Sequence, residues 1–117
     1  MIQKKICLLG AFGVGKTSLM RRFVQGIFDD RYLATLGVKI DRKDVVTPNG
    51  ETVRLVLWDV AGEDFRVPLQ LSYIRGASAC LYVADLTRPE TLVTARAIAS
   101  RVREQLGDLP FLLVLNK

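Results

Sequence analysis

Histidine is absent from this 117-residue chain, and cysteine occurs only twice. The lack of histidine excludes imidazole acid–base catalysis and histidine metal sites. Cys7 and Cys80 each lie inside an apolar run, which indicates two buried thiols rather than a disulfide framework. We therefore expect a single domain, residues 1–117, in the reducing environment of the cytoplasm.

Long apolar segments are also lacking. No stretch approaches the ~20 residues of a membrane span, and residues 1–5 do not form a signal peptide. Position 2 is not glycine and no cysteine lies near Lys117, so lipid-anchor motifs are missing from this chain. The net charge is +5, but the basic residues are scattered from Lys4 to Arg103. We expect no nucleic-acid partner and no membrane anchor in this chain.

Apolar runs typical of strands alternate with patterns typical of helices. Strand-like runs occupy 5–9, 53–58, 79–84 and 111–115, and Asn49-Gly50 is a hairpin signal between 38–46 and 53–58. Thr87 and Glu90 are spaced as in a capping box at the start of a helix. The order predicts an α/β fold with a mostly parallel sheet, in which only 38–46 runs antiparallel and a helix also lies between 58 and 79.

Residues 10–17 satisfy the G-x-x-x-x-G-K-[ST] pattern of a phosphate-binding loop (P-loop), between a predicted strand and a predicted helix. The glycines let backbone N–H groups close on phosphate oxygens, Lys16 supplies a charge to the β- and γ-phosphates, and Thr17 offers a hydroxyl to Mg²⁺. Asp59 ends a strand at the same edge and would reach the same metal. The implied ligand is a nucleoside di- or triphosphate, and the alternative is a glycine-rich turn without a ligand. The residues expected here are Gly10, Phe12, Gly13, Val14, Gly15, Lys16, Thr17 and Ser18.

Further motifs follow the P-loop in a characteristic order and spacing. With them, the chain resembles a Ras-superfamily small GTPase, and the T-x-G-V and W-D-x-A-G patterns favour the Rab-like branch. The resemblance implies a three-layer α/β/α P-loop NTPase fold. The motifs are Phe28, Tyr32-Leu33-Ala34-Thr35-Leu36-Gly37-Val38, Trp58-Asp59-Val60-Ala61-Gly62-Glu63-Asp64, Tyr73-Ile74-Arg75-Gly76-Ala77 and Asn116-Lys117.

The resemblance also implies roles for individual residues. Phe28 stacks on guanine, Tyr32 and Thr35 belong to the first nucleotide-sensing switch loop, Thr35 closes on Mg²⁺ and the γ-phosphate, and the Gly62 N–H senses the γ-phosphate in the second switch loop. The metal ligands are Thr17, Thr35 and Asp59, the catalytic residues are Glu63, Lys16 and Thr35, and Asn116 and Lys117 complete the nucleotide site. Taken singly, each residue is better explained without a ligand, Phe28 as a core contact, Tyr32 as a solvent-edge aromatic and Thr35 as a loop hydroxyl. Their joint spacing favours the nucleotide site. Trp58 is expected to pack at the sheet and Tyr73 to lie on a partner surface.

Two residues depart from the family pattern. Glu63 stands where the family usually carries Gln, and an ionised carboxylate cannot donate to the transition state. Glu63 acts either as a base for water or as a charged surface residue, and the sequence does not decide between them. Phe12 stands where most relatives have Gly or a small polar residue, so its ring would project near the γ-phosphate. We expect slow GTP hydrolysis.

The chain stops at Asn116-Lys117, before the Asp of the family's N-K-x-D motif. We therefore expect a G domain that is incomplete at its C-terminus, without the last strand and helix. Apolar surface on 111–115 would then be undercovered, and the chain would associate or bind nucleotide weakly.

The leading functional prediction is a GTP/GDP switch with Mg²⁺ as cofactor and slow GTPase activity. Effectors and regulators would bind near residues 32–46 and 60–76. The alternative is a nucleotide-loaded interaction module without meaningful hydrolysis. A P-loop ATPase or kinase and a basic nucleic-acid binder are further alternatives, which GDP/ADP competition and the salt dependence of binding distinguish.

Overall fold

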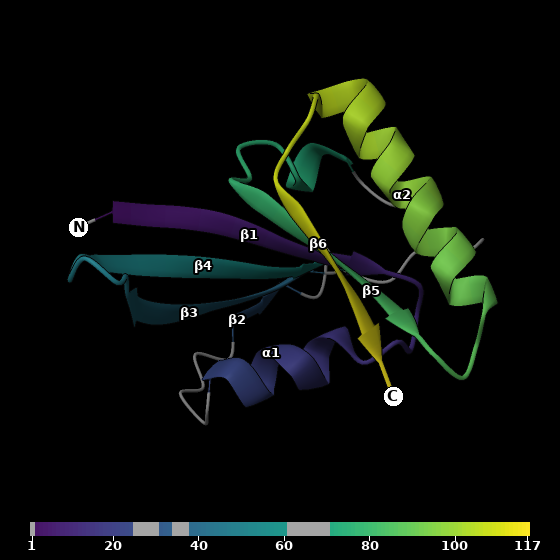
Figure 1. The fold of residues 1–117 in the computed structure, drawn as a ribbon, viewed down its shortest axis with the longest axis horizontal. Helices are drawn as coiled ribbons and strands as arrows, with labels where there is room; N and C mark the ends of the chain where they lie inside the picture. The colour runs from purple at the N-terminus through teal and green to yellow at the C-terminus, as the bar shows by residue number, and fades with distance from the viewer. Residues whose placement is uncertain (1, 25–30, 34–37, 61–70) are drawn as a thin grey trace.

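The computed structural model describes residues 2–24, 31–33, 38–60 and 71–117. Within these residues, six strands form one sheet in the order β2-β3-β4-β1-β5-β6. Strand β3 runs antiparallel to both of its neighbours, and the other pairs are parallel. The elements are β1 (Ile2–Gly10), α1 (Lys16–Val24), β2 (Arg31–Leu33), β3 (Val38–Val46), β4 (Thr52–Val60), the 3-10 turn η1 (Leu71–Tyr73), β5 (Ala79–Asp85), α2 (Glu90–Leu106) and β6 (Phe111–Asn116) (Figure 1).

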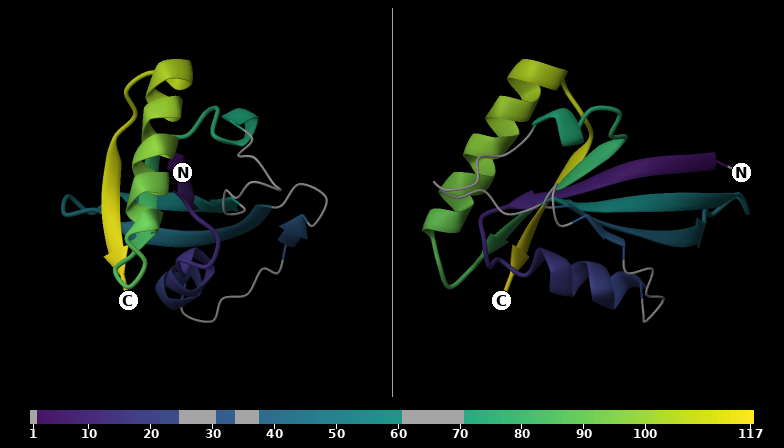
Figure 2. Two further views of the ribbon diagram at one scale, coloured as in Figure 1. Left: turned by 90° about the vertical axis from the view of Figure 1, so that its right-hand side faces the viewer. Right: turned by 180° about the vertical axis from the view of Figure 1, so that it is seen from behind.

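The predicted three-layer α/β/α arrangement is confirmed. Strand β1 lies in the middle of the sheet, and its side chains alternate between the two faces. Cys7 and Leu9 pack in the same buried cluster as Ile98 of α2, whereas Leu8 packs with Met20 of α1. The two helices therefore cover opposite faces (Figures 1 and 2).

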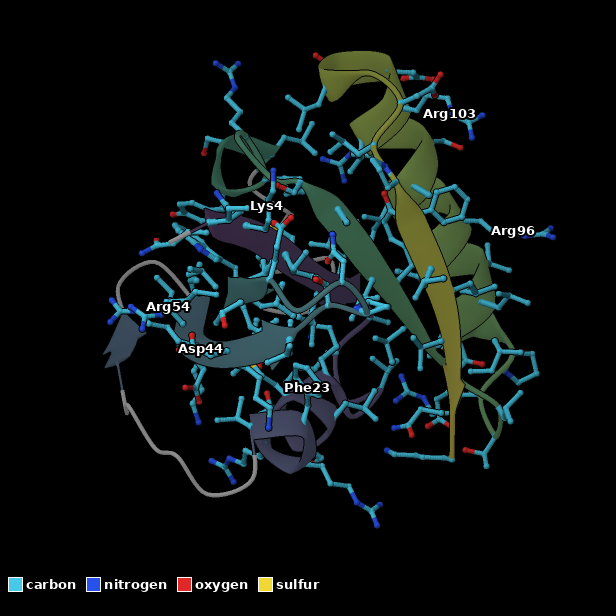
Figure 3. The ribbon with its side chains drawn as sticks, turned by 60° about the vertical axis from the view of Figure 1, so that its left-hand side comes forward. Lys4, Phe23, Asp44, Arg54, Arg96 and Arg103 are labelled. Carbon is cyan, nitrogen blue, oxygen red and sulfur yellow. The ribbon has the colours of Figure 1, made fainter. Side chains whose placement is uncertain are left out.

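The β3–β4 hairpin turns at the predicted Asn-Gly position. The Gly50 N–H donates to the Thr47 carbonyl at 2.9 Å, and the Thr47 N–H donates to the Glu51 carbonyl at 2.8 Å. Gly50 has a φ of +85°, which an L side chain rarely adopts. Arg54 and Asp44 face each other across the two strands, with Nε 2.8 Å from Oδ1 (Figure 3). The pairing places Val38 of β3 opposite Val60, beside the end of β4 that carries Asp59.

The structure adds one strand that was not predicted, and one expected helix lies mainly outside the described residues. Strand β2 was not predicted, and it extends the sheet by pairing Arg31–Leu33 with Val38–Ile40 of β3. The helix expected between 58 and 79 falls mainly on residues 61–70, outside the described residues. The part of that segment that is described contains the single turn η1.

The capping-box prediction for α2 is wrong. The helix begins at Glu90, its N-cap position is Pro89, and no side chain caps it. The Thr87 hydroxyl donates instead to Oδ1 of Asp85 at 2.6 Å. A different threonine closes this turn, because the buried Thr91 hydroxyl donates to the Arg88 carbonyl at 2.7 Å.

Helix α2 ends at Leu106, directly before Gly107. The Gly107 N–H donates to the Arg103 carbonyl at 3.0 Å, and Gly107 has a φ of +84°. The buried stripe of the helix includes Ala95, Ile98 and Val102. In the described part of the chain, neither helix is long and apolar enough to cross a membrane.

The face that α1 covers carries a large apolar groove. Helix α1 is only nine residues long and leaves a cavity of about 600 Å³ against the sheet. Strand β6 lies at the sheet edge beside it, and the side chains of Phe111 and Leu112 are 55% and 66% exposed. The expected undercovered apolar surface on 111–115 is therefore confirmed. The groove is lined by Ile6, Leu8, Leu19, Met20, Phe23, Leu55, Leu57, Ala79, Cys80, Leu81, Val83, Pro110, Phe111, Leu112 and Val114.

Candidate functional site

The P-loop connects the end of β1 to the first turn of α1 and depends on three glycines. Gly13 and Gly15 have φ angles of +78° and +96°, in the region that favours glycine. Gly10 is required for a different reason, because a Cβ there would lie 2.4 Å from the Val83 carbonyl oxygen of β5. Val14 is fully buried and anchors the loop against Val83. The sequence pattern is thus needed for the backbone shape as well as for any ligand.

Three functional groups meet where the P-loop enters α1. Lys16 and Asp59 are 7% and 6% exposed, and Lys16 Nζ lies 3.7 Å from Asp59 Oδ1. The Thr17 hydroxyl donates to the other carboxylate oxygen, Oδ2. Burial lowers the pKa of Lys16, and the neighbouring Asp59 charge partly opposes that shift. The three residues predicted to act together at this point are therefore adjacent.

The outer side of the P-loop is held by side chains from later strands and loops. Three consecutive backbone carbonyls of the loop accept hydrogen bonds from three basic or amide side chains. Two of the donors, Asn116 and Lys117, were predicted to belong to the site, and the third, Arg88, was not. The contacts join Arg88 Nη1 to the Phe12 oxygen at 3.2 Å, Lys117 Nζ to the Gly13 oxygen at 2.9 Å and Asn116 Nδ2 to the Val14 oxygen at 3.0 Å.

A second buried carboxylate, Asp85, supports this outer side and was missed by sequence reasoning. It ends the apolar run 79–84 at the carboxyl edge of β5, and this position was the available signal. Its side chain is 3% exposed, and Oδ2 lies 3.7 Å from Lys117 Nζ. Hydrogen bonds from the Thr87 hydroxyl and N–H lower the pKa of Asp85, assisted by the Lys117 and Arg88 charges.

We expect Thr87→Val to raise the pKa of Asp85 toward 3.8, because the substitution removes the hydroxyl that contributes most to the shift. A carboxyl whose folded-state pKa is lowered stabilises the fold above its unfolded-state pKa, and that stability is lost as the pH falls through the folded-state pKa. The variant should therefore unfold in acid at a higher pH than the wild type. Carboxyl NMR titration and acid unfolding measure the two effects.

Thr94→Val is the matched control, because the Thr94 hydroxyl donates to the Glu90 carbonyl within α2, at 3.2 Å. It should leave the pKa of Asp85 unchanged. An Asp85 titration that is the same in Thr87→Val and in the wild type would contradict this assignment.

Some of the remaining predicted residues lie in the described part of the chain, and the others lie outside it. Phe12 projects outward with 72% of its surface exposed, and Ser18 is exposed on α1. Trp58 and Tyr73 are partly buried against the α2-side core, as expected for Trp58, and Lys5 Nζ lies 3.8 Å from the centre of the Trp58 ring. The structure does not describe Phe28, Thr35, Gly62, Glu63 or the side chain of Tyr32. The roles predicted for these residues therefore stay predictions.

Comparison with known proteins gives a match over nearly the whole chain. Residues 5–117 match the family model described as "Ras of Complex, Roc, domain of DAPkinase". The chain belongs to the Ras superfamily of small GTPases. Its Rab-like character is supported by 34% identity over 118 aligned positions to "Ras-related protein Rab-32B" of Dictyostelium discoideum. That alignment covers 97% of this chain and 45% of the relative, so the chain spans about half of the relative's length.

Ras-superfamily GTPases generally use Mg²⁺ together with their nucleotide, and the oxygen donors at this site are compatible with that ion. Mg²⁺ prefers oxygen ligands and is bound by few protein groups together with phosphate oxygens. Thr17 and Asp59 present a hydroxyl and a carboxylate side by side. The part of the chain that the structure describes contains no group of three or more His, Cys, Asp or Glu side chains able to hold a metal ion.

Proposed function

We propose that this chain is a guanine-nucleotide-binding switch domain that binds GTP and GDP with Mg²⁺. The observation that carries the proposal is the loop between β1 and α1. Its carbonyls at positions 12–14 are held from outside, and the buried Lys16 lies at the start of the following helix. Such a loop presents N–H groups and one cation to a polyphosphate.

The charge of Lys16 is suited to a phosphate ligand. Because its side chain is nearly excluded from water, its attraction for an anion is screened less than that of a surface lysine. Asp59 and Thr17 hold the oxygen atoms that would bind Mg²⁺, and the ion when bound neutralises phosphate charge. We assign Thr35 to the same metal and to the γ-phosphate by family resemblance.

The same family resemblance assigns roles to residues that contact the guanine base and to residues of the two switch loops. Phe28 is assigned to stacking on the base, Gly62 to sensing of the γ-phosphate, and Tyr32 to the first switch loop. Effectors and regulators would then bind the surface around residues 32–46 and 60–76. Loops of this kind order around the triphosphate and relax after hydrolysis.

Direct binding tests the proposal. The chain is titrated into a fluorescent GDP analogue with Mg²⁺, and unlabelled GDP and ADP are then added as competitors. We expect GDP to displace the analogue at concentrations at least about 100-fold lower than ADP, which corresponds to about 2.7 kcal/mol. Equal competition by ADP would support the P-loop ATPase alternative, and the absence of binding would contradict nucleotide recognition.

We propose that GTP hydrolysis is slow in this chain. The Phe12 side chain is exposed at the P-loop, so its ring is available to occupy space beside the terminal phosphate. Glu63 replaces the amide that would donate to the transition state. Phe12→Gly combined with Glu63→Gln should raise the single-turnover hydrolysis rate by at least about 10-fold, since one such donor is worth roughly 100-fold or more.

The two single variants serve as controls, because each restores only one of the two features. A wild-type rate equal to that of the double variant would overturn the proposal of slow hydrolysis. If both proteins bind GTP and neither hydrolyses it, the alternative of a nucleotide-loaded interaction module is favoured.

We place this activity in the cytoplasm. The two cysteines, Cys7 and Cys80, are free and buried. Burial raises the pKa of the Cys7 thiol to about 12, which keeps it protonated and unreactive at neutral pH. These are properties of structural thiols in a reducing compartment.

A further inference from the structure

Arg88 contacts the P-loop from a position 76 residues further along the chain. It lies in the short connection between β5 and α2, at the edge of the sheet where the P-loop turns. Its Nη1 and Nη2 atoms both donate to the Phe12 carbonyl oxygen, at 3.2 and 3.3 Å. A cation on a carbonyl makes a stronger hydrogen bond than a neutral donor, and two donors from one guanidinium also restrict its direction.

The base of the Arg88 side chain is itself fixed. The Arg88 N–H donates to the Asp85 carbonyl at 3.0 Å, and the Arg88 carbonyl accepts from the Thr91 hydroxyl at 2.7 Å. The Nε atom lies 3.4 Å from Glu90 Oε1, which places a carboxylate beside the guanidinium. The contact with Phe12 is thus made by a residue whose backbone is held by hydrogen bonds to Asp85 and Thr91.

The geometry of the peptide bond transmits this contact to the inner side of the loop. The Phe12 carbonyl and the Gly13 N–H belong to one peptide unit, and none of the described peptide bonds is cis. In a trans peptide these two groups point in opposite directions. A guanidinium that holds the carbonyl outward therefore holds the Gly13 N–H inward, and it polarises that N–H into a stronger donor.

We propose that Arg88 is a positioning residue for the nucleotide, acting through the Phe12–Gly13 peptide to aim the Gly13 N–H at a phosphate oxygen. The inference rests on the proposed function, because it assigns a phosphate to that N–H. Arg88 contacts backbone atoms, so its effect is independent of the side chain at position 12. Lys117 and Asn116 donate to the next two carbonyls, so these three side chains together hold three successive peptide units of the loop.

The test compares Arg88→Ala and Arg88→Lys with Arg96→Ala. Arg96 is exposed on α2 and points away from the sheet, so its replacement removes a cation without touching the P-loop (Figure 3). Arg88→Ala should release a fluorescent GDP analogue about 10-fold faster than the wild type, because it removes a charge-assisted hydrogen bond from the Phe12 carbonyl. Arg88→Lys keeps the positive charge but loses the paired donors of the guanidinium. Its release rate should lie between those of the wild type and Arg88→Ala. Arg96→Ala should match the wild type within about twofold.

A second readout separates positioning from general stability. The amide exchange rate and NMR shift of Gly13 should change in nucleotide-free Arg88→Ala, while the thermal midpoint stays within about 2 °C of the wild type. An unchanged Gly13 amide together with an unchanged release rate would overturn the proposal. A chain that binds no nucleotide would contradict the proposed function, and the Gly13 amide of the free chain would still decide whether Arg88 positions this peptide.

Discussion

Lys16→Met should lower the affinity of the chain for GDP by at least about 100-fold, or about 2.7 kcal/mol. The substitution keeps much of the apolar length of the side chain and removes its charge. The Lys16 ammonium is nearly excluded from water and lies beside the carboxylate of Asp59, at the start of α1. A cation in that position stabilises bound phosphate more than a solvated one does, and no other described side chain in the P-loop carries a positive charge.

The control for this prediction is Lys43→Met, which makes the same chemical change on β3. Lys43 Nζ lies 5.4 Å from the centre of the Phe23 ring, near the far end of α1 from the P-loop. This variant should bind GDP within about twofold of the wild type. Titration calorimetry measures both affinities, and circular dichroism checks that both variants fold. A folded Lys16→Met protein that retains wild-type affinity would exclude Lys16 from phosphate binding.

Gly15→Ala should abolish nucleotide binding by a different route. Gly15 has a φ of +96°, and a Cβ at this position would lie 2.4 Å from Asn116 Nδ2. The added methyl group must displace Asn116 from the Val14 carbonyl, which it contacts at 3.0 Å. The N–H groups of the loop then lose their alignment. We expect a loss of GDP affinity of at least about 100-fold and a fall of about 1–3 kcal/mol in the free energy of unfolding.

The control variant Gly50→Ala separates the loss of GDP affinity from the loss of folding stability. Gly50 has a φ of +85° in the β3–β4 turn, and a Cβ there would meet no atom within 4 Å. The control therefore carries the backbone strain without the clash and lies far from the P-loop in the fold. Chemical denaturation should show destabilisation in both variants, while only Gly15→Ala loses GDP binding. Loss of binding in both would mean that destabilisation alone accounts for the effect.

The sequence predicted the parts of the fold that depend on local pattern. The Asn49-Gly50 turn and the parallel core strands appear where the apolar runs and turn residues indicate. The P-loop was predictable because its glycines, lysine and threonine are contiguous and each has a local reason to be there. Asp59 was predictable from its place at the end of a buried strand.

The errors arise where a side chain had competing partners. Thr87 has the spacing of a helix cap, yet its hydroxyl donates to the buried carboxylate of Asp85, and the helix takes Pro89 as its N-cap with no side-chain cap. Strand β2 spans only three residues and exists through its pairing with β3, so no periodicity revealed it. The contact of Arg88 with Phe12 joins positions 76 residues apart and leaves no sequence pattern.

The proposed switch function depends on a guanine nucleotide bound at the P-loop. The most direct measurement is to denature the purified protein and to identify any released nucleotide by chromatography and mass spectrometry. We expect the released nucleotide to be GDP or GTP, with a large GTP fraction if hydrolysis is slow. Adenine nucleotide would contradict the account, as would a nucleotide-free protein that also fails to take up GDP when Mg²⁺ is supplied.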